Sequence, residues 1–243
     1  MLPRLAFVHI PKCGGTSLKT ALQDVYSRRG NTTLWLDPHA SKRAADVADA
    51  DLYALRAHLL LYHLAQRRPR YITGHYTFSE AAWEAGPEPW AFLTVLRDPV
   101  ARWYSAYFYN RHKTNSDHFR IHEPLAEFVE TERAQKMGRT YVRRLTADRK
   151  APDAVETVIL TLQRFDVVGV LEEMDALVRD CERVVGERLS VPILNTSPRG
   201  ERERADEITP AIEAKVRALC APDLRIYEAV RERIVRDGGW TTR

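Results

Sequence analysis

An apolar run followed at once by a glycine pair constrains this chain more than any other feature of its sequence. The run LAFVHI (5–10) has the length and composition of a buried strand, and a helical pattern starts at about Thr16. The segment PKCGG (11–15) connects them. A loop that leaves a strand and enters a helix points backbone N–H groups outward, where the helix dipole also favours negative charge. We therefore expect this connection to bind an anion.

The residues of the connection suit a phosphate group. Gly14 and Gly15 let the backbone approach a ligand without a clashing Cβ atom, and Lys12 supplies a mobile positive charge. Thr16 and Ser17 add hydroxyl donors. The alternative is a strand-to-helix turn in which the glycine pair only relieves strain.

Two phosphate chemistries fit the connection poorly. The triphosphatase signature places lysine directly after the last glycine, whereas here Thr16 follows Gly15. Cysteine phosphatases use a thiolate with arginine six residues later, but the sixth residue after Cys13 is Lys19, which lacks the guanidinium fork. The sequence therefore indicates a nucleotide phosphate without ATP hydrolysis, and the Cys13 side chain is interpreted as a small loop residue.

Short β-rich runs alternate with helical patterns along the whole chain, which predicts an α/β fold with a mainly parallel sheet flanked by helices. No linker divides the sequence, so we expect one domain over residues 1–243. Strands are expected at 5–10, 32–36, 70–74, 90–96 and 166–171. Helices are expected from about 16, over 51–67, from 99, at several places before 165, and over 172–186, 209–220 and 223–236.

A second anion segment follows the expected strand at 90–96. Arg97 lies at the carboxyl end of that strand, where ligands gather in open α/β sheets, and Pro99 suits the first turn of a helix. Ser105 falls about two turns into this helix. The alternative is that Arg97 and Asp98 form a structural ion pair.

The segments FVHIPKCGGTS (7–17) and VLRDPVARWYSAYF (95–108) together resemble sulfotransferases that use 3′-phosphoadenosine 5′-phosphosulfate (PAPS). The resemblance extends in particular to the branch with the heparan sulfate and uronyl 2-O-sulfotransferases and their bacterial relatives, and FDVVGVLEEMD (165–175) is similar to a later element of that branch. It implies a P-loop-like nucleotide-binding fold, PAPS as sulfuryl donor, 3′-phosphoadenosine 5′-phosphate (PAP) as product, and no metal. The site residues that it implies are Lys12, Cys13, Gly14, Gly15, Thr16 and Ser17 for the 5′ side and Arg97 and Ser105 for the 3′-phosphate.

The resemblance also implies that the loop ILNTSPRG (193–200) covers the nucleotide through Arg199 and Gly200. The charge run RGERER (199–204) is as readily a solvated surface. The basic segment 134–147 invites two interpretations as well, a lining for an anionic acceptor or a solvated helix face. Its cations are Lys136, Arg139, Arg143 and Arg144.

Sulfuryl transfer to a hydroxyl needs a base, and histidine is suited to this role because its ordinary pKa lies near neutral pH. His75 follows the expected strand at 70–74 and should emerge at the same sheet edge as Lys12 and Arg97. The segment GHYTF (74–78) also resembles the segment that bears the catalytic histidine in the 2-O branch. We assign His75 as the base and Lys12 as the catalytic cation; the alternative for His75 is a buried histidine that orients a loop.

The predicted function is in-line sulfuryl transfer from PAPS to a hydroxyl of a carbohydrate or another small molecule. The alternatives are a non-catalytic module that binds phosphoadenosine nucleotides and a P-loop phosphotransferase. A net charge of +4 suits an anionic ligand, but aromatic residues are not interleaved with the basic ones as nucleic-acid binding requires. Three distant cysteines, no apolar run of membrane-spanning length and no room for a signal peptide before residue 5 predict a cytoplasmic protein.

Overall fold

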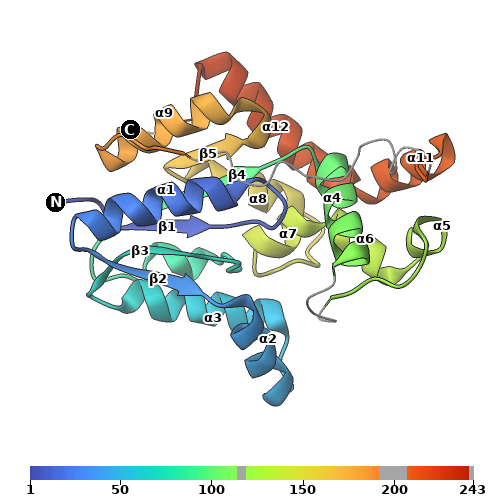
Figure 1. Ribbon diagram of the computed structural model, residues 1–243, viewed down its shortest axis with the longest axis horizontal. Helices are drawn as coiled ribbons and strands as arrows, with labels where there is room; N and C mark the ends of the chain where they lie inside the picture. The colour runs from blue at the N-terminus through green and yellow to red at the C-terminus, as the bar shows by residue number, and fades with distance from the viewer. Residues whose placement is uncertain (114–118, 192–206, 241–243) are drawn as a thin grey trace.

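Five parallel strands form the sheet of this protein. The computed structural model describes residues 1–113, 119–191 and 207–240, and within them the strands run in the order β2-β3-β1-β4-β5 (Figure 1). The strands are β1 (Leu5–Val8), β2 (Thr32–Leu36), β3 (Pro69–Gly74), β4 (Ala91–Leu96) and β5 (Val167–Val170). The prediction of an α/β fold with a mainly parallel sheet is confirmed. Because the strands are parallel, their carboxyl ends meet at one edge.

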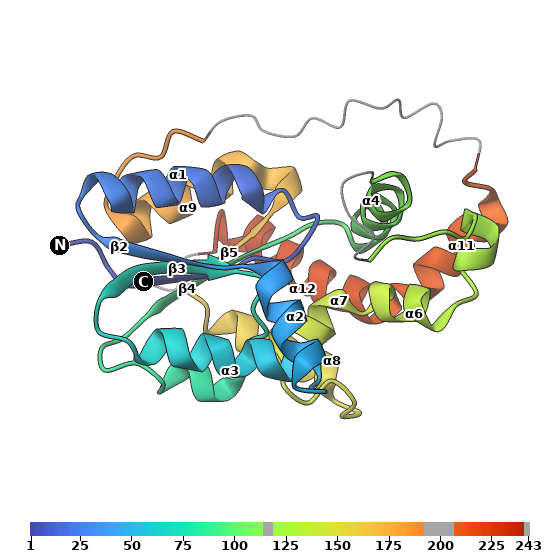
Figure 2. The same ribbon diagram turned by 60° about the horizontal axis from the view of Figure 1, so that its bottom comes forward.

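Helices cover both faces of the sheet. The helices of the first half are α1 (Gly15–Arg28), α2 (Pro38–Val47), α3 (Leu52–Ala65), the 3₁₀ helix η1 (Glu80–Trp83) and α4 (Pro99–His112). Those of the second half are α5 (Leu125–Phe128), α6 (Glu132–Gly138), α7 (Thr140–Leu145), α8 (Ala154–Gln163), the 3₁₀ helix η2 (Leu171–Glu173), α9 (Met174–Val185), α11 (Pro210–Leu219) and α12 (Ala221–Asp237). Helices α1 and α9 lie on one face of the sheet, and α3 and α8 lie on the other (Figure 2).

Burial explains why the central strands could be predicted from their composition. Every residue of β1, β4 and β5 is buried, as expected for strands of a parallel sheet that is covered on both faces. The edge strand β2 is only partly buried. A separate apolar cluster beside the sheet packs α4 against α5, α6 and α11, with Trp103 and Phe128 among its fully buried members.

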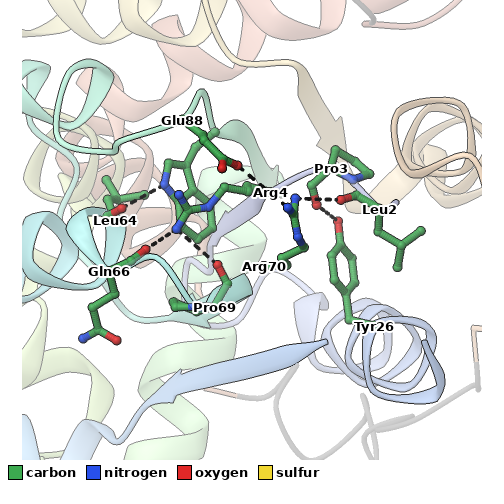
Figure 3. Close-up of polar contacts among 10 residues, drawn as sticks. Leu2, Pro3, Arg4, Tyr26, Leu64, Gln66, Pro69, Arg70 and Glu88 are labelled. Carbon is green, nitrogen blue, oxygen red and sulfur yellow. Dashed lines mark hydrogen bonds and ion pairs between the residues drawn. The ribbon is translucent and has the colours of Figure 1, made fainter. Parts of the chain in front are cut away.

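The amino-terminal edge of the sheet is closed by two arginines (Figure 3). The Arg4 guanidinium donates to the carbonyls of Gln66 and Pro69 and lies over the Trp90 ring, 4.3 Å from its centroid. Arg70 donates to the Leu2 carbonyl at 3.2 Å. These bonds pair main-chain oxygens at the strand starts, so this edge is occupied by structural contacts.

The predicted elements agree with the structure except at a few places. The first helix begins at Gly15, and α11 and α12 match the two helices expected at the end of the chain. Helix α2 was not predicted, although Asp37 caps its start by accepting from two backbone N–H groups and Pro38 occupies its first turn. The single-domain prediction for residues 1–243 stays a prediction.

Helix α12 holds the start of α7 through one buried carboxylate. Asp223 accepts hydrogen bonds from the backbone N–H groups of Tyr141, at 2.9 Å, and Val142, at 3.3 Å. Burial raises the pKa of the Asp223 carboxyl to about 7, although Arg102 acts in the opposite direction. The position of α7 therefore depends on a carboxyl group that binds a proton more tightly when the chain is folded.

The raised pKa of Asp223 predicts a pH dependence of stability. A carboxyl whose pKa is higher in the folded chain stabilises the fold at low pH, and this contribution is lost as pH rises through about 7. Between about pH 5 and pH 7, this group should lower the free energy of unfolding by about 2 kcal/mol. Urea unfolding at both values tests this: Asp223→Asn should remove most of the difference, whereas Asp46→Asn, an exposed control, should keep it. An unchanged pH slope in Asp223→Asn would contradict the assignment.

Candidate functional site

The turn between β1 and α1 has the backbone that an anion site requires. Gly14 lies in the left-handed region with a φ of 72°, and a Cβ atom there would come within 2.3 Å of the Leu171 side chain. Lys12, a residue with a Cβ atom, also has a positive φ of 67°. Such strain persists only where the surroundings enforce it, and it concentrates at functional sites.

The start of α1 has no side-chain cap. Its N-cap residue, Gly14, has no side chain that could accept from the first N–H groups, and its first turn contains no acidic residue. The first N–H groups of a helix have no partner within the helix and carry its positive dipole end. The helix start therefore presents backbone N–H donors without a side-chain cap at the carboxyl edge of the sheet.

The side chains of this turn divide into exposed and buried ones. Thr16 is exposed, whereas Ser17 and Cys13 are buried. The Cys13 sulfur lies 3.8 Å from the Tyr141 hydroxyl, and burial raises the pKa of its thiol to about 12. The thiol is therefore protonated at neutral pH and cannot act as a nucleophile, so Cys13 can contribute to an anion site only through its backbone.

Arg97 joins the second anion segment to the first. Its guanidinium donates to the Lys12 carbonyl at 3.4 Å, and its backbone N–H donates to the Tyr141 hydroxyl at 3.0 Å. The same hydroxyl donates to the Arg97 carbonyl. The two segments, 85 residues apart in the sequence, thus lie against each other at the carboxyl edge.

Asp98 caps helix α4. Its carboxylate accepts from the Ala101 backbone N–H at 2.8 Å, and its own N–H donates to Glu172 at 2.9 Å. Tyr227 of α12 donates its hydroxyl to the other Glu172 oxygen, also at 2.9 Å. The carboxylate of Asp98 therefore caps α4. Among the described residues it forms no ion pair with Arg97, so the alternative of a structural ion pair between Arg97 and Asp98 is wrong.

Lys12 reaches the face of α4 that carries Ser105. The Lys12 ammonium lies 3.8 Å from the centroid of the Tyr109 ring. Ser105, which is half-buried, precedes Tyr109 by four residues, so the two share one face of the helix. The structure thus brings Lys12, Arg97 and this helix face into one region.

His75 is held in a defined tautomer. Its Nδ1 atom lies 2.7 Å from the carbonyl oxygen of His9. Because a carbonyl oxygen only accepts, Nδ1 carries the proton, and Nε2 keeps its lone pair. Burial lowers the pKa of His75 well below 6.5, and the neighbouring His9 and Arg144 lower it further. His75 is therefore neutral at neutral pH, with one nitrogen ready to accept a proton.

Arg144 supports His75 from helix α7. Its guanidinium donates to the carbonyls of His75 and Tyr76, and burial lowers its pKa. Its Nε atom is buried with no hydrogen-bond partner among the described residues. Arg144 is buried, so the interpretation as a solvated helix cation is wrong for this residue, while a role in lining an acceptor site stays a prediction. Lys136 by contrast lies on the surface, where it pairs with Glu132 at 2.7 Å.

His9 lies between His75 and the turn. Its ring centroid is 4.9 Å from that of His75 and 5.1 Å from that of Phe7, and burial lowers its pKa to about 4. A Cβ atom on Gly15 would come within 2.7 Å of the His9 ring. Glycine is therefore required at position 15 because the ring occupies the space of a side chain.

Some predicted features are not described by the structure. Arg199 and Gly200, together with most of the loop around them, lie outside the described residues. Within the described ranges, no group of three or more histidine, cysteine, aspartate or glutamate residues could hold a metal ion, and no helix is long and apolar enough to span a membrane.

Tyr109 and Tyr141 were missed by the sequence analysis. Tyr109 stands four residues after Ser105 on a helix, a spacing that could have placed it on the same face. No local signal reveals Tyr141, because its bonds join residues 44 positions apart.

Comparison with known proteins leaves the function to be argued from these residues. No protein-family model matches the chain, and no curated protein matches it. Among solved structures, a sulfotransferase from Alicyclobacillus acidocaldarius is similar over 95% of this chain and 96% of that chain, with 19% sequence identity and a TM-score of 0.47. At this TM-score the likeness carries no argument.

The contact between Gly15 and His9 predicts a coupling between two variants. Gly15→Ala should destabilise the fold by about 1–3 kcal/mol, because the new methyl group overlaps the His9 ring. His9→Ala removes that ring, so the double variant should lose less stability than the sum of the single losses. Urea unfolding of the three variants measures this coupling. Additive losses would show that the ring does not restrict position 15.

Proposed function

We propose that this protein is a sulfotransferase that moves a sulfuryl group from PAPS to a hydroxyl of a carbohydrate or another small molecule. The observation that carries the proposal is the junction of two anion segments beside a neutral histidine. Arg97 bonds to the turn that carries Lys12, and His75 directly follows the neighbouring strand β3, with Nε2 unprotonated. A donor with phosphate groups at both ends and a base for an acceptor hydroxyl match these features.

The turn fits a 5′-phosphate group on two grounds. Its first helix N–H groups have no side-chain cap, and Cβ atoms at Gly14 and Gly15 would collide with neighbouring side chains. The two glycines let the backbone turn in the narrow space that these side chains leave, and the uncapped N–H groups can donate to a ligand oxygen. In the proposal, Lys12, Thr16, Ser17 and the backbone from Cys13 to Gly15 hold the 5′ side. Arg97 and Ser105 hold the 3′-phosphate, with Arg199 and Gly200 covering the nucleotide.

A hollow beside the turn suits the nucleoside. It has a volume of about 420 Å³, is lined by Leu171–Ala176 and Arg179, and adjoins Gly14 through Leu171. Its carboxylates, among them Glu173 and Asp175, would repel a phosphate but accept from ribose hydroxyls or an adenine amino group. We assign the nucleoside to this hollow and the phosphates to the turn and Arg97.

The reaction needs no change of protonation before it starts. When bound, PAPS supplies the sulfuryl group, whose bond to the 5′-phosphate oxygen breaks as the acceptor oxygen bonds to sulfur. His75 Nε2 takes the acceptor proton, and the His9 carbonyl then stabilises the imidazolium that forms, since it accepts from Nδ1. Lys12 donates to the phosphate oxygens, on which the electron pair of the broken bond remains.

Removal of either catalytic side chain should stop transfer without unfolding the protein. Lys12→Ala and His75→Ala should each lower the transfer of labelled sulfate from PAPS by about two orders of magnitude or more. His75→Ala should keep its affinity for PAP, because the base does not touch the nucleotide in this proposal. His58→Ala, on the exposed face of α3, and Lys136→Ala provide matched controls that keep full activity.

The same assay separates the alternatives. A non-catalytic nucleotide-binding module would bind PAP but transfer no sulfate to any acceptor in a panel of sugars and small hydroxyl compounds. A phosphotransferase would transfer phosphate from ATP with magnesium. Near-normal turnover of His75→Ala would remove this residue as the base and leave the donor assignment intact.

The lowered pKa of His75 predicts the acid limb of the pH profile. A base with an ordinary histidine pKa would lose half of its unprotonated form near pH 6.5. Since burial, His9 and Arg144 all lower the pKa of His75, kcat/KM should stay nearly constant from about pH 7.5 to about pH 6.5. Initial rates across this range measure it, and a half-loss centred near pH 6.5 would contradict the assigned environment.

A further inference from the structure

An aromatic ring holds the lysine of the anion turn. The Lys12 ammonium lies over the Tyr109 ring at 3.8 Å from its centroid, and Tyr109 projects from α4 with 56% of its surface exposed. An ammonium this close to a ring face is attracted by the electrons of the ring. The large exposed ring of Tyr109 therefore has a partner of opposite electrostatic character.

The cation–π contact is weak enough for the Lys12 ammonium to leave the Tyr109 ring when a phosphate binds. A cation–π contact at an exposed site contributes a factor of about two to five in an equilibrium, whereas a hydrogen bond between charged groups contributes more. The Lys12 ammonium would therefore leave Tyr109 and bind a phosphate placed at the start of α1. The cost of this exchange would appear as a slightly weakened affinity for the nucleotide.

Geometry places the ring next to the second anion segment. Tyr109 follows Ser105 by one helical turn, and Arg97 stands just before the same helix and bonds to the Lys12 carbonyl. The contact with Tyr109 thus keeps the ammonium at the α4 side of the site, between the two segments that the proposed nucleotide would bridge.

We propose that Tyr109 is a positioning residue that holds the Lys12 ammonium against α4 until a nucleotide phosphate takes it. This inference rests on the proposed function for its second step, the release to phosphate. Its first step, the contact in the ligand-free protein, stands on the ring geometry alone. No bond is made or broken in either step.

Lysine NMR tests the contact without measuring activity. The chain has seven lysines, so reductive methylation with ¹³C, which keeps their charge, gives few resonances. The Lys12 methyl signal, assigned with Lys12→Arg, should be shifted upfield by the Tyr109 ring. The shift should persist in Tyr109→Phe and vanish in Tyr109→Leu. Lys19, 5.0 Å from the Trp35 ring centroid, provides an internal reference that no Tyr109 variant should change.

Titration with PAP tests the release. Addition of PAP should move the Lys12 signal out of its upfield position, and Tyr109→Leu should bind PAP about two- to fivefold more tightly than the wild type. Tyr109→Phe should bind it as the wild type does. Tyr62→Leu, at another exposed tyrosine, should change neither measurement.

The outcomes separate this inference from the proposed function. A Lys12 signal at an unshifted position in the ligand-free protein, or one that Tyr109→Leu leaves unchanged, overturns the inference even if PAP binds. A PAP-bound protein whose Lys12 signal stays upfield overturns the release. An upfield Lys12 signal in a protein that does not bind PAP overturns the release together with the proposed function, but not the contact with the ring.

Discussion

The candidate site depends on the hydrogen bonds that one short helix makes with two loops. From α7, Tyr141 exchanges two hydrogen bonds with the backbone of Arg97, and Arg144, one turn later, donates to the carbonyl of His75. The carboxyl of Asp223 fixes the start of this helix. Since a single turn of helix touches both loops, a displacement of α7 would move the anion segment and the histidine together.

The charges of the site favour one protonation state for each group. Burial and the nearby Arg144 lower the pKa of His75 and keep it neutral, while burial raises the pKa of the Cys13 thiol and keeps it protonated, although Arg102 acts in the opposite direction. Arg144 has no ion-pair partner among the described residues, although its guanidinium lies 4.8 Å from the centroid of the Tyr53 ring, and its charge lowers the pKa of His75. The environment thus favours a neutral imidazole at His75 and disfavours a thiolate at Cys13.

Much of this arrangement could be predicted because it depends on local sequence patterns. Buried parallel strands are continuous apolar runs, and a glycine pair between such a run and a helix indicates an anion turn. The position of His75 could be predicted because this residue directly follows β3. The bonds of Tyr141 and Arg144 could not be predicted, because they join residues 44 and 69 positions apart, and an arginine on a short helix has the sequence pattern of a solvated cation. Helix α2 was missed although its cap residues were visible.

The first turn of α1 would couple the stability of the helix to the binding of an anion. Its N-cap, Gly14, contributes no side-chain acceptor, and the first turn contains no acidic residue that could balance the positive end of the dipole. A bound anion would complete this end of the helix as a cap does elsewhere. Ligand affinity and resistance of the first turn to fraying would then rise together, and amide hydrogen exchange in this turn would report occupancy directly.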